Sequence, residues 1–152
     1  MSIAKLYQLI EDSLAHLGLN PEDARCAEEG QWLVYRDKIE IYIDLWQETE
    51  LNEWMYYPDA ANTFTFQVAA PICKFPKEEV LLHFYEDVLQ MNSLSQYVSF
   101  VINKSEKILS CNFKRITENL TKADVIEAIE AAGYYADLSW KMLKEPYHLK
   151  KP

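Results

Sequence analysis

The sequence predicts an α+β fold, in which a five-stranded, mainly antiparallel sheet carries helices packed on one face. Apolar residues recur at helical spacing in three segments of the chain, and between those segments they alternate with polar residues in five short runs. The 152 residues show no internal repeat, low-complexity tract or linker. We therefore expect one domain over residues 1–152, with the element order α-β-β-β-α-β-β-α.

The first helix is predicted over residues 3–17. Gly18 follows at the position of a C-terminal cap, and Asn20-Pro21 indicates a turn that leads away from the helix. The apolar stripe of this helix consists of Ile3, Leu6, Leu9, Ile10, Leu14 and Leu17.

Three strands of an antiparallel meander are predicted next. A short aromatic-rich run at 32–35 is followed by a tight turn and by strict alternation over 39–46. The third strand covers 63–70, and it should stop near Pro71 because proline cannot donate a hydrogen bond to a ladder. The face that should be buried carries Ile39, Ile41, Ile43, Leu45, Phe64, Phe66, Val68 and Ala70.

Residues 77–91 return to helical spacing, with two apolar stripes instead of one. A single sheet can hide only one of these stripes, so something else must cover the other. The first stripe consists of Val80, Leu81, Phe84 and Val88, and the second of Leu82, Tyr85 and Leu89.

The last part of the chain predicts a second hairpin, from 98–102 and 109–113, and a long helix. Thr121 and Asp124 have the spacing of a capping box at the start of that helix. Gly133 is a point where the helix can bend or break, since glycine costs a helix interior about 1 kcal/mol relative to alanine. The core stripe runs through Val125, Ile129, Ala132, Ala136, Trp140 and Leu143, with Pro146 beyond it.

The composition excludes several classes of function. The net charge of −9 argues against broad binding to nucleic-acid backbones, which requires a concentrated basic surface. The acidic charge lies mainly in the first half, which favours basic protein segments as partners, although it also has the simpler interpretation of solubility. No apolar run approaches the roughly 18 residues of a membrane span, and the three cysteines lie far apart, as in reduced proteins. We expect a cytoplasmic protein with neither nucleic-acid nor membrane partners.

The sequence contains no motif for a cofactor or a metal. Its three glycines are too far apart for a phosphate-binding loop, and its histidines and cysteines lack the short spacing of metal ligands. We expect neither cofactor nor metal. Two catalytic arrangements stay open: Cys73 beside His83 after folding, and Glu40 with Asp44 on one strand face, although any solvated strand face shows the second spacing.

Aromatic residues occupy positions that should be polar. Tyr42 and Trp46 fall on the strand face opposite the apolar one, and a loop over 47–62 contains further apolar residues. Aromatic and methionine side chains are enriched at the centres of protein interfaces, so these residues predict a surface that binds a partner chain. The alternative is that the loop folds over the sheet and hides them. The apolar residues of the loop are Trp54, Met55, Tyr56 and Tyr57.

A run of sequence marks from Phe64 to Leu143 resembles a known family. A strand reading Phe-Thr-Phe-Gln-Val-Ala-Ala closes with proline, a leucine-rich helix ends at Asn92, a hairpin follows, and Leu120-Thr121 opens the final helix. In these marks the chain resembles the bacterial YbjN-like family and the class I type III secretion chaperones that share its fold. The resemblance implies a small acidic homodimer that binds an extended, non-globular segment of another protein without consuming ATP.

These observations lead to one main hypothesis and one alternative. The main hypothesis is a non-catalytic, chaperone-like protein-binding module, in which the acidic strand face of the first half and the segment from Trp46 to Tyr57 contact the partner. Leu82, Tyr85 and Leu89 form the homodimer interface. The alternative is a small hydrolase or ligand-binding domain whose site is built from Glu40, Asp44 and the loop that follows them.

Overall fold

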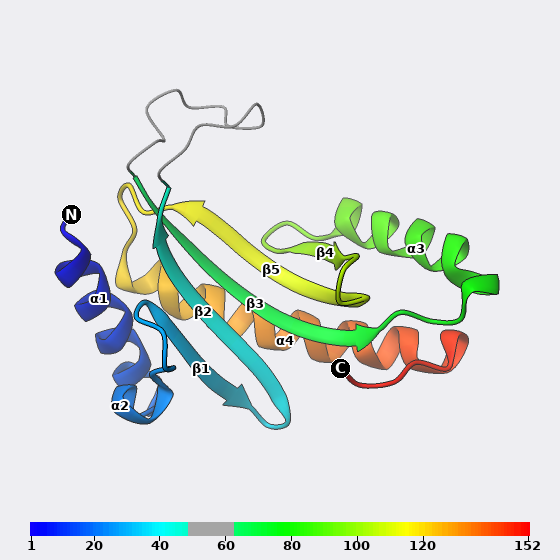
Figure 1. The fold of residues 1–152 in the computed structure, drawn as a ribbon, viewed down its shortest axis with the longest axis horizontal. Helices are drawn as coiled ribbons and strands as arrows, with labels where there is room; N and C mark the ends of the chain where they lie inside the picture. The colour runs from blue at the N-terminus through cyan, green and yellow to red at the C-terminus, as the bar shows by residue number, and fades with distance from the viewer. Residues whose placement is uncertain (49–62) are drawn as a thin grey trace.

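The chain forms a twisted sheet with helices behind it and at its sides (Figure 1). The computed structural model describes residues 1–48 and 63–152. Its helices are α1 (Ile3–His16), α2 (Pro21–Ala24), α3 (Leu81–Leu94) and α4 (Lys122–Tyr147), and η2 (Glu78–Val80) is a short 3-10 helix that leads into α3. Its strands are β1 (Gln31–Arg36), β2 (Ile39–Gln47), β3 (Phe64–Lys74), β4 (Ser99–Asn103) and β5 (Ile108–Ile116).

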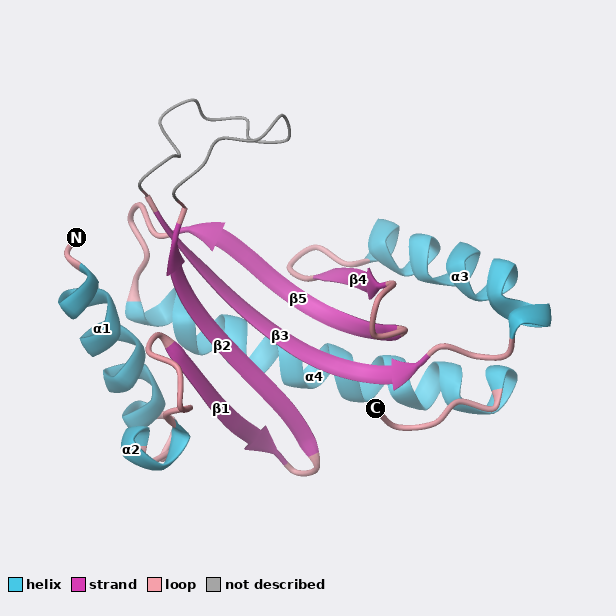
Figure 2. Ribbon diagram, viewed as in Figure 1, coloured by secondary structure: helices cyan, strands magenta, loops and turns pink. Residues whose placement is uncertain are grey.

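The predicted sheet is confirmed. In the described part of the chain, five strands pair in the order β1-β2-β3-β5-β4, and every pairing is antiparallel. α4 crosses behind the sheet, α1 lies beside α4, and α3 runs along the β4 edge (Figure 2). The opposite side, which we call the open sheet face, carries none of the described helices in this view.

The first helix forms for the reasons that its sequence predicts. The Ser2 hydroxyl accepts the amide of Lys5 at the N-terminus, and Gly18 adopts a left-handed conformation, with φ of +79°, after the last turn. Asn20-Pro21 does more than make a turn. The Asn20 side chain accepts the amide of Glu22 and Pro21 takes the first helical position, so the pair begins α2.

The prediction that the third strand stops near Pro71 is wrong, because β3 continues to Lys74. Pairing between β2 and β3 ends at Tyr42 and Ala69, so the missing amide of Pro71 costs no ladder bond on that side. On the other side, the pairing with β5 shifts register between Pro71 and Cys73, which indicates a bulge. The proline therefore sits where the sheet tolerates it.

The capping box at the start of the last helix is confirmed, but the helix is longer and more regular than predicted. α4 neither breaks at Gly133 nor ends before Pro146. A β-carbon at Gly133 would lie 2.7 Å from Cδ of Arg36 and 3.1 Å from Cδ1 of Ile41. The glycine therefore lets α4 approach the first hairpin closely, which explains its place in a helix interior. Pro146 falls in the last turn, and His148 ends the helix in a left-handed conformation.

α3 buries only one of its two apolar stripes. Phe84 and Val88 are buried, and the ring of Phe84 packs against Phe75 and Tyr147. These contacts attach the helix to the end of β3 and to the C-terminal turn of α4. The stripe predicted to face the sheet thus belongs to the core, as expected.

Candidate functional site

The second stripe of α3 is exposed in the described structure. The exposed fraction of Leu82 is 68% and that of Leu89 is 69%, while Tyr85 is half-buried. We call these three residues the α3 outer stripe. Exposed leucines at helical spacing mark a surface that a partner can cover, and the predicted homodimer interface stays a prediction.

Side chains close the first part of the β4 edge beside α3. Asn92 donates to the carbonyl of Phe100 at 3.1 Å and accepts its amide at 2.7 Å, and Ser95 makes the same pair of bonds with Val98. Edge strands are commonly blocked in this way against pairing with another chain. A groove of about 820 Å³ lies between α3 and β4, with Tyr85 and Leu89 among its lining residues. A chain that docks here therefore meets the side chains of α3.

Tyr42 and Trp46 lie on the open sheet face, as predicted. The Tyr42 hydroxyl donates to Glu40 at 2.8 Å, and this bond, followed by burial, raises the pKa of Tyr42 to about 12. The indole N–H of Trp46 donates to Glu48 at 2.8 Å, and Nζ of Lys114 lies 5.1 Å from the centre of its ring. Tyr42 is 36% exposed and Trp46 is half-buried, so part of each ring is accessible.

The remaining predicted partner-binding residues lie outside the described residues. They are Trp54, Met55, Tyr56 and Tyr57. Their part in a binding surface stays a prediction.

Both carboxylates of the predicted alternative interact with neighbouring side chains. Glu40 accepts the Tyr42 hydroxyl, and burial raises the pKa of Asp44 above its usual value, against a hydrogen bond from Gln31 that lowers it. Neither Glu40 nor Asp44 lines the cavities that residues 1–48 and 63–152 form beside α1, beside α4 and between α3 and β4. The arrangement gives no specific support to a hydrolase.

Cys73 and His83, the other candidate catalytic pair, occupy positions that do not favour catalysis. Cys73 is fully buried, and burial raises the pKa of its thiol to about 12, which disfavours the nucleophilic thiolate. His83 lies on the exposed side of α3, where Nδ1 is 3.6 Å from a carboxylate oxygen of Glu86. Within residues 1–48 and 63–152, no three His, Cys, Asp or Glu side chains gather as a metal site would require. No described helix is long and apolar enough to cross a membrane.

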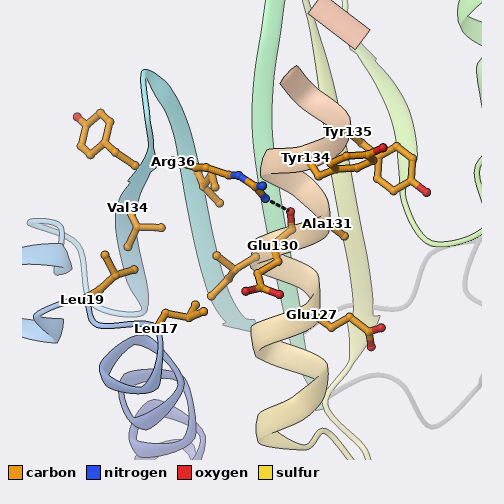
Figure 3. Close-up of a pocket in the computed structure, with 12 residues that line it drawn as sticks. Leu17, Leu19, Val34, Arg36, Glu127, Glu130, Ala131, Tyr134 and Tyr135 are labelled. Atoms are coloured by element: carbon orange, nitrogen blue, oxygen red, sulfur yellow. Dashed lines mark hydrogen bonds between the residues drawn. The ribbon is translucent and has the colours of Figure 1, made fainter. Parts of the chain in front are cut away.

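A cavity of about 610 Å³, which we call the edge cavity, lies between the end of α1, the β1–β2 hairpin and α4 (Figure 3). Sequence analysis missed it. A signal for an exposed surface on α4 was present, because Tyr134, Leu138 and Met142 repeat every four residues outside the predicted core stripe and are exposed. Tyr134 lines the edge cavity, together with Leu17 and Leu19.

Comparisons with known proteins support the fold. No family model and no curated protein matches the sequence. A chain of the ExsC–ExsE complex matches with a TM-score of 0.60 and 12% identity, covering 94% of this chain and 97% of that chain. A chain of the HopA1–SchA chaperone–effector complex matches with a TM-score of 0.58 and 10% identity, covering 93% and 98%.

The structure of YbjN from E. coli also matches. Its TM-score is 0.55 at 14% identity, and the match covers 100% of this chain and 97% of that chain. At these identities the likeness concerns the fold. The predicted resemblance to YbjN-like proteins and to secretion chaperones is confirmed at that level.

Proposed function

We propose that this chain is a non-catalytic protein-binding module, which forms a homodimer and binds an extended segment of a partner protein. The observation that carries the proposal is the exposure of apolar side chains on two separate surfaces, the α3 outer stripe and the open sheet face. The matched structures support it, since one is a complex of ExsC with ExsE and another is a chaperone–effector complex. We further propose that the protein works in the cytoplasm of a bacterium.

The α3 outer stripe serves the homodimer. A two-fold axis beside α3 brings the same stripe of each subunit together, so that Leu82 and Leu89 bury one another. Stable interfaces bury roughly 1,200–2,000 Å² in total, and the groove between α3 and β4 extends the contact beyond the three stripe residues. Because Asn92 and Ser95 occupy the backbone groups at the start of the β4 edge, we expect the dimer to form through side chains.

The open sheet face binds the partner. Tyr42 and Trp46 act as aromatic anchors, because truncating a central aromatic residue in an interface typically costs about 2 kcal/mol or more. Acidic side chains accompany them, with Glu40 beside Tyr42 and Glu48 beside Trp46. A segment that combines apolar and basic residues complements this surface in both respects. Residues 54–57 extend the same surface in our proposal.

A co-purification screen tests the partner site. The tagged full chain is compared with Trp46→Ala, and with Met142→Ala as a matched control, because Met142 is exposed on α4. We expect Trp46→Ala to lose a partner that both the native chain and Met142→Ala retain. Trp54→Ala tests the residues outside the described structure in the same screen. Identical partner lists for all the variants would rule out the proposed surface.

A further inference from the structure

The C-terminal turn of α4 is joined to α3 through the side chain of Tyr147. The hydroxyl of Tyr147, the last residue of α4, donates to a carboxylate oxygen of Asp87 in the middle of α3. The ring of Tyr147 also packs edge-on against the ring of Phe84, with the ring centroids 5.3 Å apart. Figure 1 shows this turn of α4, in red, close to the first half of α3. A polar contact and an aromatic contact thus link two helices through residues that lie 60 positions apart in the sequence.

The residues after α4 fix the position of Tyr147. His148 adopts a left-handed conformation, and its amide and the next one donate to carbonyls in the last turn of α4, which is the pattern of a Schellman cap. The carbonyl of Lys150 then accepts the amide of Lys74, at the end of β3, at 3.0 Å. The last turn of α4 is therefore tied to the sheet, so Tyr147 holds α3 from a fixed point.

A second anchor holds α3 on its other flank. Asn92 exchanges two hydrogen bonds with the backbone of Phe100 on β4. With about 3.6 residues per turn, Asp87 and Asn92 point roughly 140° apart around the helix axis. The buried side chains of Phe84 and Val88 lie between these two directions. Anchors on both flanks fix the rotation of α3 about its own axis, which an anchor on one flank alone would leave less restricted.

The rotation of α3 decides where the α3 outer stripe points. Leu82 and Leu89 lie roughly 140–160° around the helix axis from Asp87, so neither Asp87 nor Tyr147 is part of the stripe. In a two-fold interface both copies must present the stripe in the same orientation, because each leucine meets the same surface of the other copy. The bond between Tyr147 and Asp87 therefore bears on the dimer from outside the contact surface.

We propose that Tyr147 and Asp87 position α3 for homodimer formation, so that the C-terminal turn of α4 sets the fraction of subunits that are competent to dimerise. The inference rests on the proposed function and makes both residues positioning residues. Each dimer needs two competent subunits, so a competent fraction f raises the apparent dissociation constant by a factor of 1/f². A fall of f from near one to about 0.3 weakens the dimer about tenfold.

Four variants of the full chain separate positioning from a loss of stability. Tyr147→Phe keeps the ring against Phe84 and removes the hydroxyl, whereas Asp87→Ala removes the acceptor. Asp87→Asn keeps an oxygen that can accept the same bond. Tyr134→Phe is the matched control, because it removes a hydroxyl from an exposed residue of the same helix. The dimer dissociation constant of each protein is measured by sedimentation velocity over a series of concentrations.

We expect Tyr147→Phe and Asp87→Ala each to raise the dimer dissociation constant about tenfold. The double variant should raise it no further, because either change breaks the same bond. Asp87→Asn should stay within about threefold of the native chain, and Tyr134→Phe should match the native chain. Unchanged dissociation constants for Tyr147→Phe and Asp87→Ala would overturn the inference, and so would separate effects that multiply in the double variant.

Amide hydrogen exchange provides a readout that a general loss of stability would not reproduce. At concentrations where both proteins are mostly dimeric, the amides of α3 should exchange faster in Tyr147→Phe, whereas those of β3 should keep their native rate. Faster exchange throughout the chain would contradict positioning. If the native protein is a dimer that neither Tyr147→Phe nor Asp87→Ala weakens, the proposed function survives and only this inference fails. A monomeric native protein would instead refute the homodimer, and this inference with it.

Discussion

Replacing Gly133 with alanine should destabilise the protein, although alanine is the better helix former. The added carbon would lie 2.7 Å from Cδ of Arg36, whereas carbon atoms prefer about 3.5 Å or more, so the Arg36 side chain must move by about 0.8 Å. Overpacking of this kind costs roughly 1–3 kcal/mol, and displacing Arg36 weakens its bond to the carbonyl of Glu130 by about 1 kcal/mol. Alanine recovers about 1 kcal/mol of helix propensity. The expected loss in the free energy of unfolding is therefore about 1–3 kcal/mol.

Urea unfolding followed by circular dichroism measures this loss as a lower midpoint with an unchanged slope. Arg36→Ala removes the closest clash, so in that background Gly133→Ala should cost less than about half as much, the remainder coming from Ile41 at 3.1 Å. If Gly133→Ala is neutral or stabilising in the native background, or costs the same in both backgrounds, the steric explanation is wrong.

Three further predictions follow from single side chains. Asn92→Ala should lower the free energy of unfolding by about 1–3 kcal/mol, because it leaves both backbone groups of Phe100 without partners; Ser93→Ala, an exposed neighbour, should change it little. Hydrogen bonds from Thr121 hold the pKa of the Asp124 carboxyl below its usual value. The carboxylate therefore stabilises the fold above the pKa that it has in the unfolded chain, and this stabilisation is lost as the pH falls through the pKa that it has in the folded chain. Asp124→Asn should therefore be less stable at neutral pH and approach the native chain in acid melts. Burial raises the pKa of Asp44, so the stability of the fold falls as the pH rises from the pKa of this group in the unfolded chain to its pKa in the folded chain. Asp44→Asn should therefore have a higher melting temperature than the native chain at neutral pH and the same melting temperature in acid.

The spacing of apolar residues predicted most of the fold, because each helix or strand buries the face on which its own sequence places them. Ile41 and Ile43 alternate with polar neighbours, and the structure buries them as the alternation requires. Thr121 and Asp124 carry their own capping geometry, so the helix start could be predicted from two residues. Pro71 and Gly133 could not be interpreted in the same way. Their effects depend on where the β2 pairing ends and on how closely α4 approaches Arg36, and both are set by tertiary structure.

The candidate surfaces also differ in whether local sequence or tertiary structure determines them. The second stripe of α3 was predicted from spacing alone, and Leu82 and Leu89 are exposed because no described element lies over them. The edge cavity could not be predicted, because it brings Leu19 next to Val34 and Tyr134, which are far apart in the sequence. Spacing along one element identifies an exposed face, whereas a cavity between three elements requires their arrangement in space.

Sedimentation velocity of the purified chain at micromolar concentration tests the central claim most directly. The native protein should sediment as a dimer, and the double variant Leu82→Lys with Leu89→Lys should sediment as a monomer with an unchanged circular dichroism spectrum, since both side chains are exposed in the single chain. A native protein that is strictly monomeric, or a double variant that stays dimeric, would contradict a homodimer formed through the α3 outer stripe.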